Sequence, residues 1–187
     1  MSRSRLRQTR ARAADPDGAL IGGREKREIV IVDYDPSWPV RFERERKRVR
    51  RALGAAALRV EHIGSTAVPG LAAKPIVDLL VVVTDAVDDG VTVTSLEAAG
   101  YELRVCEPGH RMFRTPERDV HVHVWGAADS EVTRHLRFRD RLRESPTDRD
   151  AYERLKRELS TREWGDMNEY ADAKATLIAA ILARAES

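Results

Sequence analysis

Two stretches of the sequence carry residue types that can bind a phosphate group or a metal ion. The first, residues 61–78 (EHIGSTAVPGLAAKPIVD), combines a glycine-serine turn with an acid, Asp78, inside an otherwise apolar run. Glycine at position 64 lets the backbone approach a phosphate closely, and the Ser65 hydroxyl and the N–H groups of the turn can donate to it. A carboxylate in an apolar strand is costly unless a cation faces it. An ordinary structural Gly-Ser turn explains the same residues equally well.

The second stretch is a histidine pair in residues 119–124. His121 and His123 are two positions apart, so in a strand both side chains point to the same face. They are candidates either for ligating a metal or for hydrogen bonding inside the sheet. His62 and His110 lie close to turn glycines, where they could reach the edge of a cleft or orient the loops by hydrogen bonds.

Three basic residues are candidates for recognising an anion. Lys74 precedes Asp78 by four residues at the strand entrance, where it could neutralise that acid or meet a phosphate. Arg111 follows a Pro-Gly-His turn that could aim its guanidinium inward, and Lys174 shares a helix face with Tyr170. For all three, surface or structural ion pairs are the alternative.

The elements that must position these residues are strands early in the chain and helices late. Alternating or continuous apolar patterns predict strands at residues 28–33, 57–63, 75–83, 101–105, 111–115 and 119–124. Helical spacing predicts helices from Ser37 to Gly54, from Val87 to Ala99, and about three more after Gly126. This order predicts an α+β fold with a mixed sheet flanked by helices and a C-terminal helical layer.

Composition limits the kind of protein and its partners. The 187 residues fit one domain, and we expect a flexible, arginine-rich tail at 1–27 before a domain at 28–187, with a sheet core to about 126 and helices over about 127–185. The net charge is only +2 although residues 1–12 hold five arginines and no acid, so the remainder is acidic. The acidic charge of the remainder and the low aromatic content of 5% both argue against a nucleic-acid partner.

The cellular location follows from what the sequence does not contain. No run of about 18 apolar residues could span a membrane, and the arginine-rich start lacks the apolar stretch of a secretory signal. A single cysteine, Cys106, provides neither an internal disulfide nor a thiolate zinc site. We therefore expect a cytoplasmic protein with no membrane partner.

The chain resembles the GrpB family along most of its length. The segment VEHIGSTAVPGLAAKPIVD from Val60 to Asp78 matches the hallmark of that family. Further matching blocks are YDPSWP (34–39), PGHRMF (108–113), HVHV (121–124), HLRFRDRLR (135–143) and YADAK (170–174). The resemblance covers roughly residues 28 to 185 and implies the nucleotidyltransferase superfamily, with a fold like the palm of DNA polymerase beta.

The resemblance implies roles for individual residues. The superfamily holds nucleotide phosphates on a hydrophobic-Gly-Ser turn, which Ile63-Gly64-Ser65 matches, and holds metal ions on an Asp-hydrophobic-acid strand. Asp78 matches the first acid, but Leu80 replaces the second, which leaves too few carboxylates for two-metal catalysis. The histidine strand is expected where the superfamily carries its third acid. We therefore predict a one-metal site of Asp78, His121 and His123.

Two functions of different classes follow. The first is a nucleotidyltransferase-fold enzyme that binds a nucleotide or another phosphate-bearing small molecule through Gly64, Ser65, His62, Lys74 and Arg111, with Asp78, Lys74, Arg111 and Lys174 as catalytic candidates. Its divalent ion would be Mg, Mn or Zn, and the two imidazoles favour zinc, iron or manganese over magnesium. The second is a catalytically inactive binding or partner-stabilising module, like the family members fused to dephospho-CoA kinase. The sequence leaves the nucleotide, the acceptor and the oligomeric state open.

Overall fold

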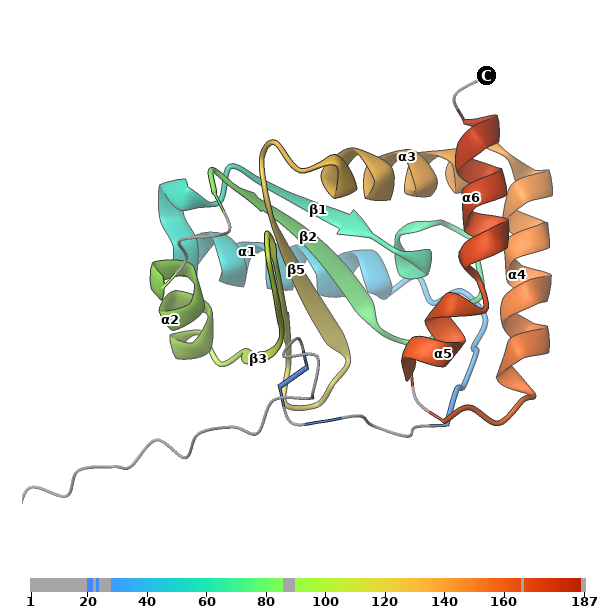
Figure 1. Cartoon of the computed structure of the whole chain (residues 1–187), viewed down its shortest axis with the longest axis horizontal. Coiled ribbons are helices and arrows are strands. Elements are labelled where there is room, and N and C mark those ends of the chain that lie inside the picture. The colour runs from blue at the N-terminus through green and yellow to red at the C-terminus, as the bar shows by residue number, and fades with distance from the viewer. Residues whose placement is uncertain (1–19, 22, 24–27, 86–89, 166, 186–187) are drawn as a thin grey trace, which may run out of the picture.

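The computed structural model describes residues 20–21, 23, 28–85, 90–165 and 167–185. In this part of the chain, five strands form one mixed sheet in the order β1-β2-β5-β4-β3 (Figure 1). The strands are β1 (Arg59–Ile63), β2 (Val77–Val83), β3 (Glu102–Glu107), β4 (His110–Arg114) and β5 (Val120–Gly126). The central strands β2 and β5 run parallel, and the other neighbours are antiparallel.

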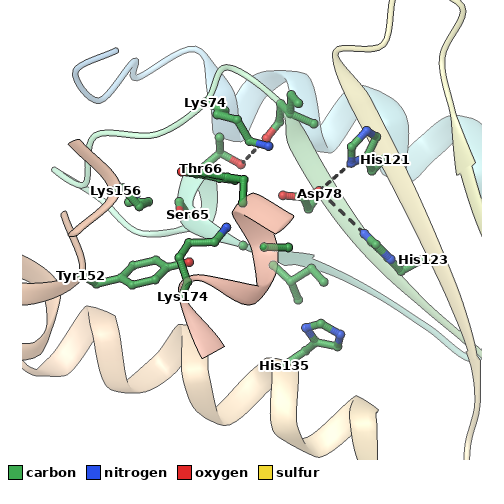
Figure 2. Close-up of a pocket in the computed structure, with 15 residues that line it drawn as sticks. Ser65, Thr66, Lys74, Asp78, His121, His123, His135, Tyr152, Lys156 and Lys174 are labelled. Atoms are coloured by element: carbon green, nitrogen blue, oxygen red, sulfur yellow. Dashed lines mark hydrogen bonds and ion pairs between the residues drawn. The ribbon is translucent and has the colours of Figure 1, made fainter. Parts of the chain in front are cut away.

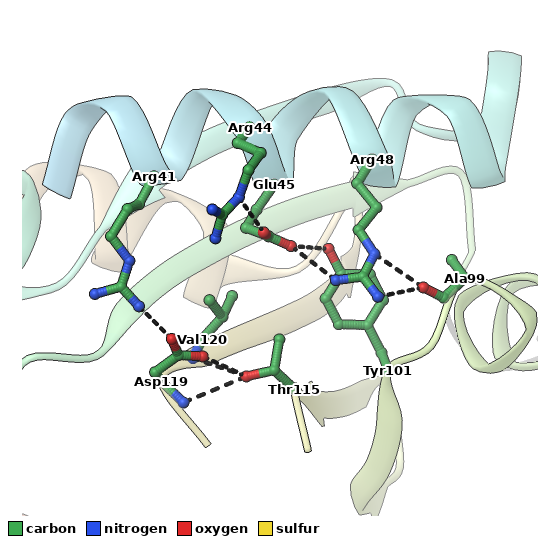
Figure 3. Close-up of polar contacts among 9 residues, drawn as sticks. All are labelled: Arg41, Arg44, Glu45, Arg48, Ala99, Tyr101, Thr115, Asp119 and Val120. Carbon is green, nitrogen blue, oxygen red and sulfur yellow. Dashed lines mark hydrogen bonds and ion pairs between the residues drawn. The ribbon is translucent and has the colours of Figure 1, made fainter. Parts of the chain in front are cut away.

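One face of the sheet packs against α1 (Trp38–Leu53) and α2 (Gly90–Ala98). The main apolar core lies here, because alternate residues of β2 and β5 point to this side and are fully buried. The buried Glu45 of α1 accepts a 2.7 Å hydrogen bond from the Tyr101 hydroxyl and pairs with Arg48, which also donates to the Ala99 carbonyl (Figure 3). These contacts tie α1 to the segment between α2 and β3.

The other face is covered by the C-terminal helices. These are α3 (Ser130–Glu144), α4 (Pro146–Ser160), α5 (Met167–Asp172) and α6 (Ala175–Arg184). Arg139 of α3 docks this layer on the sheet: its guanidinium donates to Glu61 Oε2 at 2.8 Å and to the His62 carbonyl at 3.1 Å. Among the described residues, no helix is long and apolar enough to cross a lipid bilayer.

The predicted α+β class, mixed sheet and C-terminal helical layer are confirmed, with local corrections. Residues 28–33 form no strand; Val32 makes a single bridge to Ala73, and Ile29 packs against Leu159 of the helical layer instead. Within the described residues the helical layer has four helices rather than three, because the chain breaks again at Lys174.

Several predicted features fall partly outside the described residues. Most of the tail predicted at 1–27, and residues 86–89 at the start of the helix predicted at 87–99, belong to this group. Where the tail segment is described, Leu20 bridges to Val105 and the Ile21 N–H donates to the Arg104 carbonyl at 2.8 Å. These contacts lie on the outer edge of strand β3.

Candidate metal and phosphate site

The parallel pairing of β2 and β5 brings the predicted metal ligands together. The register sets Asp78 beside His121 and Leu80 beside His123, so the acid and both histidines share one face of the sheet. Asp78 Oδ1 lies 3.3 Å from His121 Nδ1 and 3.8 Å from His123 Nε2 (Figure 2). The three candidate ligand atoms all lie within 4.8 Å of one another.

The surroundings of Asp78 keep its carboxylate ionised. Burial alone would raise the pKa of Asp78, but the contacts with His121 and His123 outweigh burial and hold the pKa well below 3.8. The three side chains are each between 21% and 26% exposed. The cluster is therefore charged and reachable from solvent.

The cluster opens into a pocket of about 370 Å³ between the sheet and the C-terminal helical layer. The sheet side supplies Asp78, His121 and His123, and the turn after β1 supplies Gly64 and Ser65. The remaining polar lining residues are Thr66 and Lys74 from the β1–β2 connection and His135, Tyr152, Lys156, Tyr170 and Lys174 from the helical layer.

Gly64 allows the turn and the acid to lie against each other. Its φ is +70°, a left-handed conformation, and a Cβ placed on it would lie 2.5 Å from Asp78 Oδ2. The sequence predicts that this glycine makes room for a phosphate; in the structure the close neighbour is the Asp78 carboxylate. The following residue, Ser65, lines the same pocket as Tyr152 from α4.

Three lysines give the pocket an excess of positive charge. The Nζ atoms of Lys74 and Lys174 lie 5.1 Å and 4.1 Å from the centre of the Tyr170 ring, while that of Lys156 lies 5.0 Å from the Tyr152 ring. Burial lowers the pKa of Lys156 to about 7, and burial together with the charge of Lys74 lowers that of Lys174 to about 8. Among the described lining residues Asp78 is the one acid.

Lys74 and Lys174, two of the three predicted anion-binding residues, line this pocket. The predicted neighbourhood of Lys174 and Tyr170 is confirmed, although Lys174 lies at the junction between α5 and α6 rather than within one helix. The two ammonium groups are close enough for the charge of Lys74 to disfavour that of Lys174.

Arg111 lies elsewhere, and the structure does not bring it to the residues that line this pocket. It pairs with Val124 on the α1 side of the sheet, and its guanidinium donates to the carbonyls of Glu107 and His110. Strand alternation is the cause: the turn directs His110 to the face of His123, so the next residue must point to the opposite face.

His62 also lies outside the residues that line the pocket. It is 7% exposed, stacks on Phe42 at 4.7 Å, and has Nε2 3.0 Å from the Thr66 hydroxyl, which donates to the Ile76 carbonyl. Burial lowers the pKa of His62 to about 4, so the ring is neutral at pH 7. Its contact with Thr66 braces the short helical turn that follows Gly64.

The sequence reasoning missed three lining residues from the helical layer: His135, Tyr152 and Lys156. The His135 ring centre lies 6.1 Å from that of His123, and burial followed by the His123 charge lowers the pKa of His135 to about 4. Tyr152 and Lys156 are four residues apart, a spacing that places them on one helix face and could have identified them together.

Leu80 shows why a second acid is absent from β2. It points to the same face as Asp78 but lies two residues further along the strand, where it packs with Ile63, Val82 and Val132 beneath α3. A carboxylate at this position would replace a fully buried apolar side chain, which is costly. The candidate site therefore ends where α3 covers this face of the sheet.

Comparisons with known proteins identify relatives of this chain and of its fold. The family model described as GrpB protein matches residues 28–184. The chain belongs to the GrpB family. A UPF0157 protein of Streptomyces coelicolor is 54% identical over 89% of each chain. The crystal structure of the conserved protein GrpB from Enterococcus faecalis, 36% identical, superposes with a TM-score of 0.75 over 83% of this chain and 96% of that one. A GrpB-like match also occurs within a dephospho-CoA kinase of Mycolicibacterium paratuberculosis, 31% identical over 78% of this chain and 43% of that protein.

Proposed function

We propose that this GrpB-family protein binds one divalent metal ion on Asp78, His121 and His123 and a nucleotide or another phosphate-bearing small molecule in the adjoining pocket. One observation carries the proposal: a carboxylate and two imidazoles lie within 4.8 Å of one another at a pocket whose other charged groups are lysines. The metal ligands and the anion-binding groups thus meet in one cavity.

The donor set fits a metal with mixed nitrogen and oxygen preference. Two imidazoles and one carboxylate suit zinc, manganese or iron, whereas magnesium prefers oxygen ligands alone. The pocket beside the cluster leaves room for further ligands from a bound molecule. When bound, such an ion would supply Lewis acidity toward a phosphate oxygen.

The chain's own groups then have distinct tasks. Lys74 and Lys174 bind the phosphate oxygens and offset their charge, and the Ser65 hydroxyl donates to the same group. The Nζ atoms of both lysines lie within cation–π distance of the Tyr170 ring, which helps to orient them. The reaction that this arrangement supports best is transfer of a nucleotidyl group to an acceptor, with catalysis by charge stabilisation. The hydrophobic-Gly-Ser turn ahead of an aspartate strand, which resembles nucleotidyltransferases, supports this choice.

A second function is a binding or partner-stabilising module without turnover. Leu80 favours it, because apolar packing under α3 occupies the position of the second acid. The match inside a protein named dephospho-CoA kinase also favours it. A binding module would use the same ligand site, whereas a partner-stabilising module would not need it, so one experiment tests the site and a second tests for turnover.

Thermal unfolding with zinc, manganese or magnesium, alone and with each nucleoside triphosphate, tests the site. A ligand at 100 times its Kd should stabilise the protein by about 2.7 kcal/mol. We expect this stabilisation to be lost in Ser65→Ala and Lys174→Met but kept in Lys47→Met, whose side chain is 69% exposed on α1. Equal stabilisation of all variants would contradict the proposal. Pyrophosphate release then separates transfer from binding alone.

A further inference from the structure

The β3–β4 hairpin extends the metal cluster by two residues. Glu107 and His110 face each other across its two-residue turn, in which Gly109 has a φ of +76°. Glu107 Oε2 lies 2.8 Å from His110 Nδ1, and His110 Nε2 lies 3.3 Å from His123 Nδ1. The other nitrogen of His123 faces Asp78. A line of polar atoms therefore runs from Glu107 to the candidate metal site.

The ring geometry shows that His110 and His123 meet edge to edge. Their planes are 5° apart and their centres 5.5 Å apart, which fits two coplanar rings joined nitrogen to nitrogen rather than stacked face to face. Trp125 stacks on His110 at 4.1 Å with planes 10° apart and fixes the plane of that ring. The side chain of His110 is only 12% exposed, so water competes little for its nitrogens.

The chemistry of the donors sets the direction of these hydrogen bonds. An ionised carboxylate can only accept, so the Nδ1–H of His110 donates to Glu107. In a neutral His110 the other nitrogen, Nε2, must then accept, and the donor that it receives is the Nδ1–H of His123. A neutral His123 with its proton on Nδ1 keeps a lone pair on Nε2, which lies 3.8 Å from Asp78 Oδ1, too far for a hydrogen bond but close enough for both atoms to hold one metal ion. This lone pair is what a metal ion needs.

We propose that Glu107 and His110 are positioning residues that hold His123 in the Nδ1–H tautomer and so preform the metal site. The inference rests on the proposed function, because it assigns a purpose to the site that the metal would occupy. Ligating histidines elsewhere owe their orientation to such outer partners, whose removal typically lowers metal affinity about 10- to 100-fold. In this chain the outer partner is a second histidine, anchored by a carboxylate on the neighbouring strand.

Zinc affinity, measured by competition with a chromophoric chelator, tests the positioning role. His110→Phe keeps a ring on Trp125 but removes both nitrogens, and Glu107→Ala removes the terminal acceptor; we expect about 10- to 100-fold weaker zinc binding in the first and a smaller loss in the second. Glu107→Gln retains an acceptor oxygen and should restore most of the affinity. Glu102→Ala is the matched control, since Glu102 pairs with Arg114 at the far end of the same hairpin.

Nitrogen-15 NMR of the imidazoles, recorded without metal at pH 8, separates this inference from the metal proposal. We expect His123 as a single Nδ1–H tautomer in the wild type and a mixture in His110→Phe. Wild-type protein that binds no zinc but shows the locked tautomer would contradict the metal site and leave the hydrogen-bonded chain in place. A wild-type His123 protonated on Nε2, or unchanged zinc affinity in His110→Phe, would overturn the positioning role.

Discussion

The two faces of strands β2 and β5 have opposite characters although they share one backbone. On the α1 side, Leu79 and Val122 are fully buried and belong to the main core. On the other side, their neighbours Asp78, His121 and His123 are about a quarter exposed and face a pocket. A slip of one residue in the pairing would exchange the two sets. The apolar face therefore fixes the register that brings the candidate metal ligands together.

Truncating a side chain on the α1 face should mainly lower stability, whereas truncating one on the pocket face should mainly lower metal binding. Leu79→Ala removes a fully buried side chain, so we expect a loss of about 4 kcal/mol in the free energy of unfolding. Asp78→Ala should cost about 2 kcal/mol because its contacts with His121 and His123 are lost, yet it should abolish metal binding. Urea denaturation and zinc titration measure the two effects. A larger loss of stability for Asp78→Ala than for Leu79→Ala would break the contrast.

The close contact between Gly64 and Asp78 permits a sharper test. Gly64→Ala should cost about 3 kcal/mol, from the left-handed backbone and from a Cβ that would lie 2.5 Å from the carboxylate. Gly70→Ala is the control: its φ is +78°, but a Cβ there meets nothing within 4 Å, so about 1 kcal/mol is expected. Urea denaturation of both variants measures the difference. Equal losses would show that the contact with Asp78 does not constrain the turn.

Acid should destabilise the protein through His62, which braces the turn from the buried side. The pKa of His62 is about 4 in the folded protein and about 6.5 in the unfolded chain, so the unfolded chain binds the proton more strongly. Stability is therefore lost as pH falls from 6.5 toward 4, by about 2 kcal/mol between pH 7 and pH 5. Urea denaturation at both pH values should show this loss in the wild type and a smaller one in His62→Gln. The same loss in both proteins would contradict a neutral, buried His62.

Much of this arrangement could be predicted from local patterns. The apolar run around Asp78, the alternation of His121 and His123, and the late helical spacing identified the central strands and the helical layer. These features depend on the strand and helix periodicities of apolar residues, which can be read directly from the sequence. The short apolar segment around Ile29 misled for the same reason, since a pattern of branched residues does not reveal whether its partner is a strand or a helix.

The remaining site residues depend on which face a strand presents and on how distant elements dock. Arg111 and His110 are adjacent, and only the register with β5 decides which of them meets His123. Lys156 reaches the pocket because α4 packs across the turn after β1, where its ammonium donates to the Ala72 carbonyl. Such contacts between segments about 80 residues apart leave no signal in local spacing.

Calorimetric titration of the full chain with zinc tests the central claim most directly. We predict one zinc ion per chain in the wild type and in Asp33→Ala, whose side chain is 91% exposed and outside the pocket. Asp78→Ala and His121→Ala should show no measurable binding while remaining folded by circular dichroism. Wild-type protein that binds no zinc, or an Asp78→Ala variant that binds it as tightly as the wild type, would contradict the account.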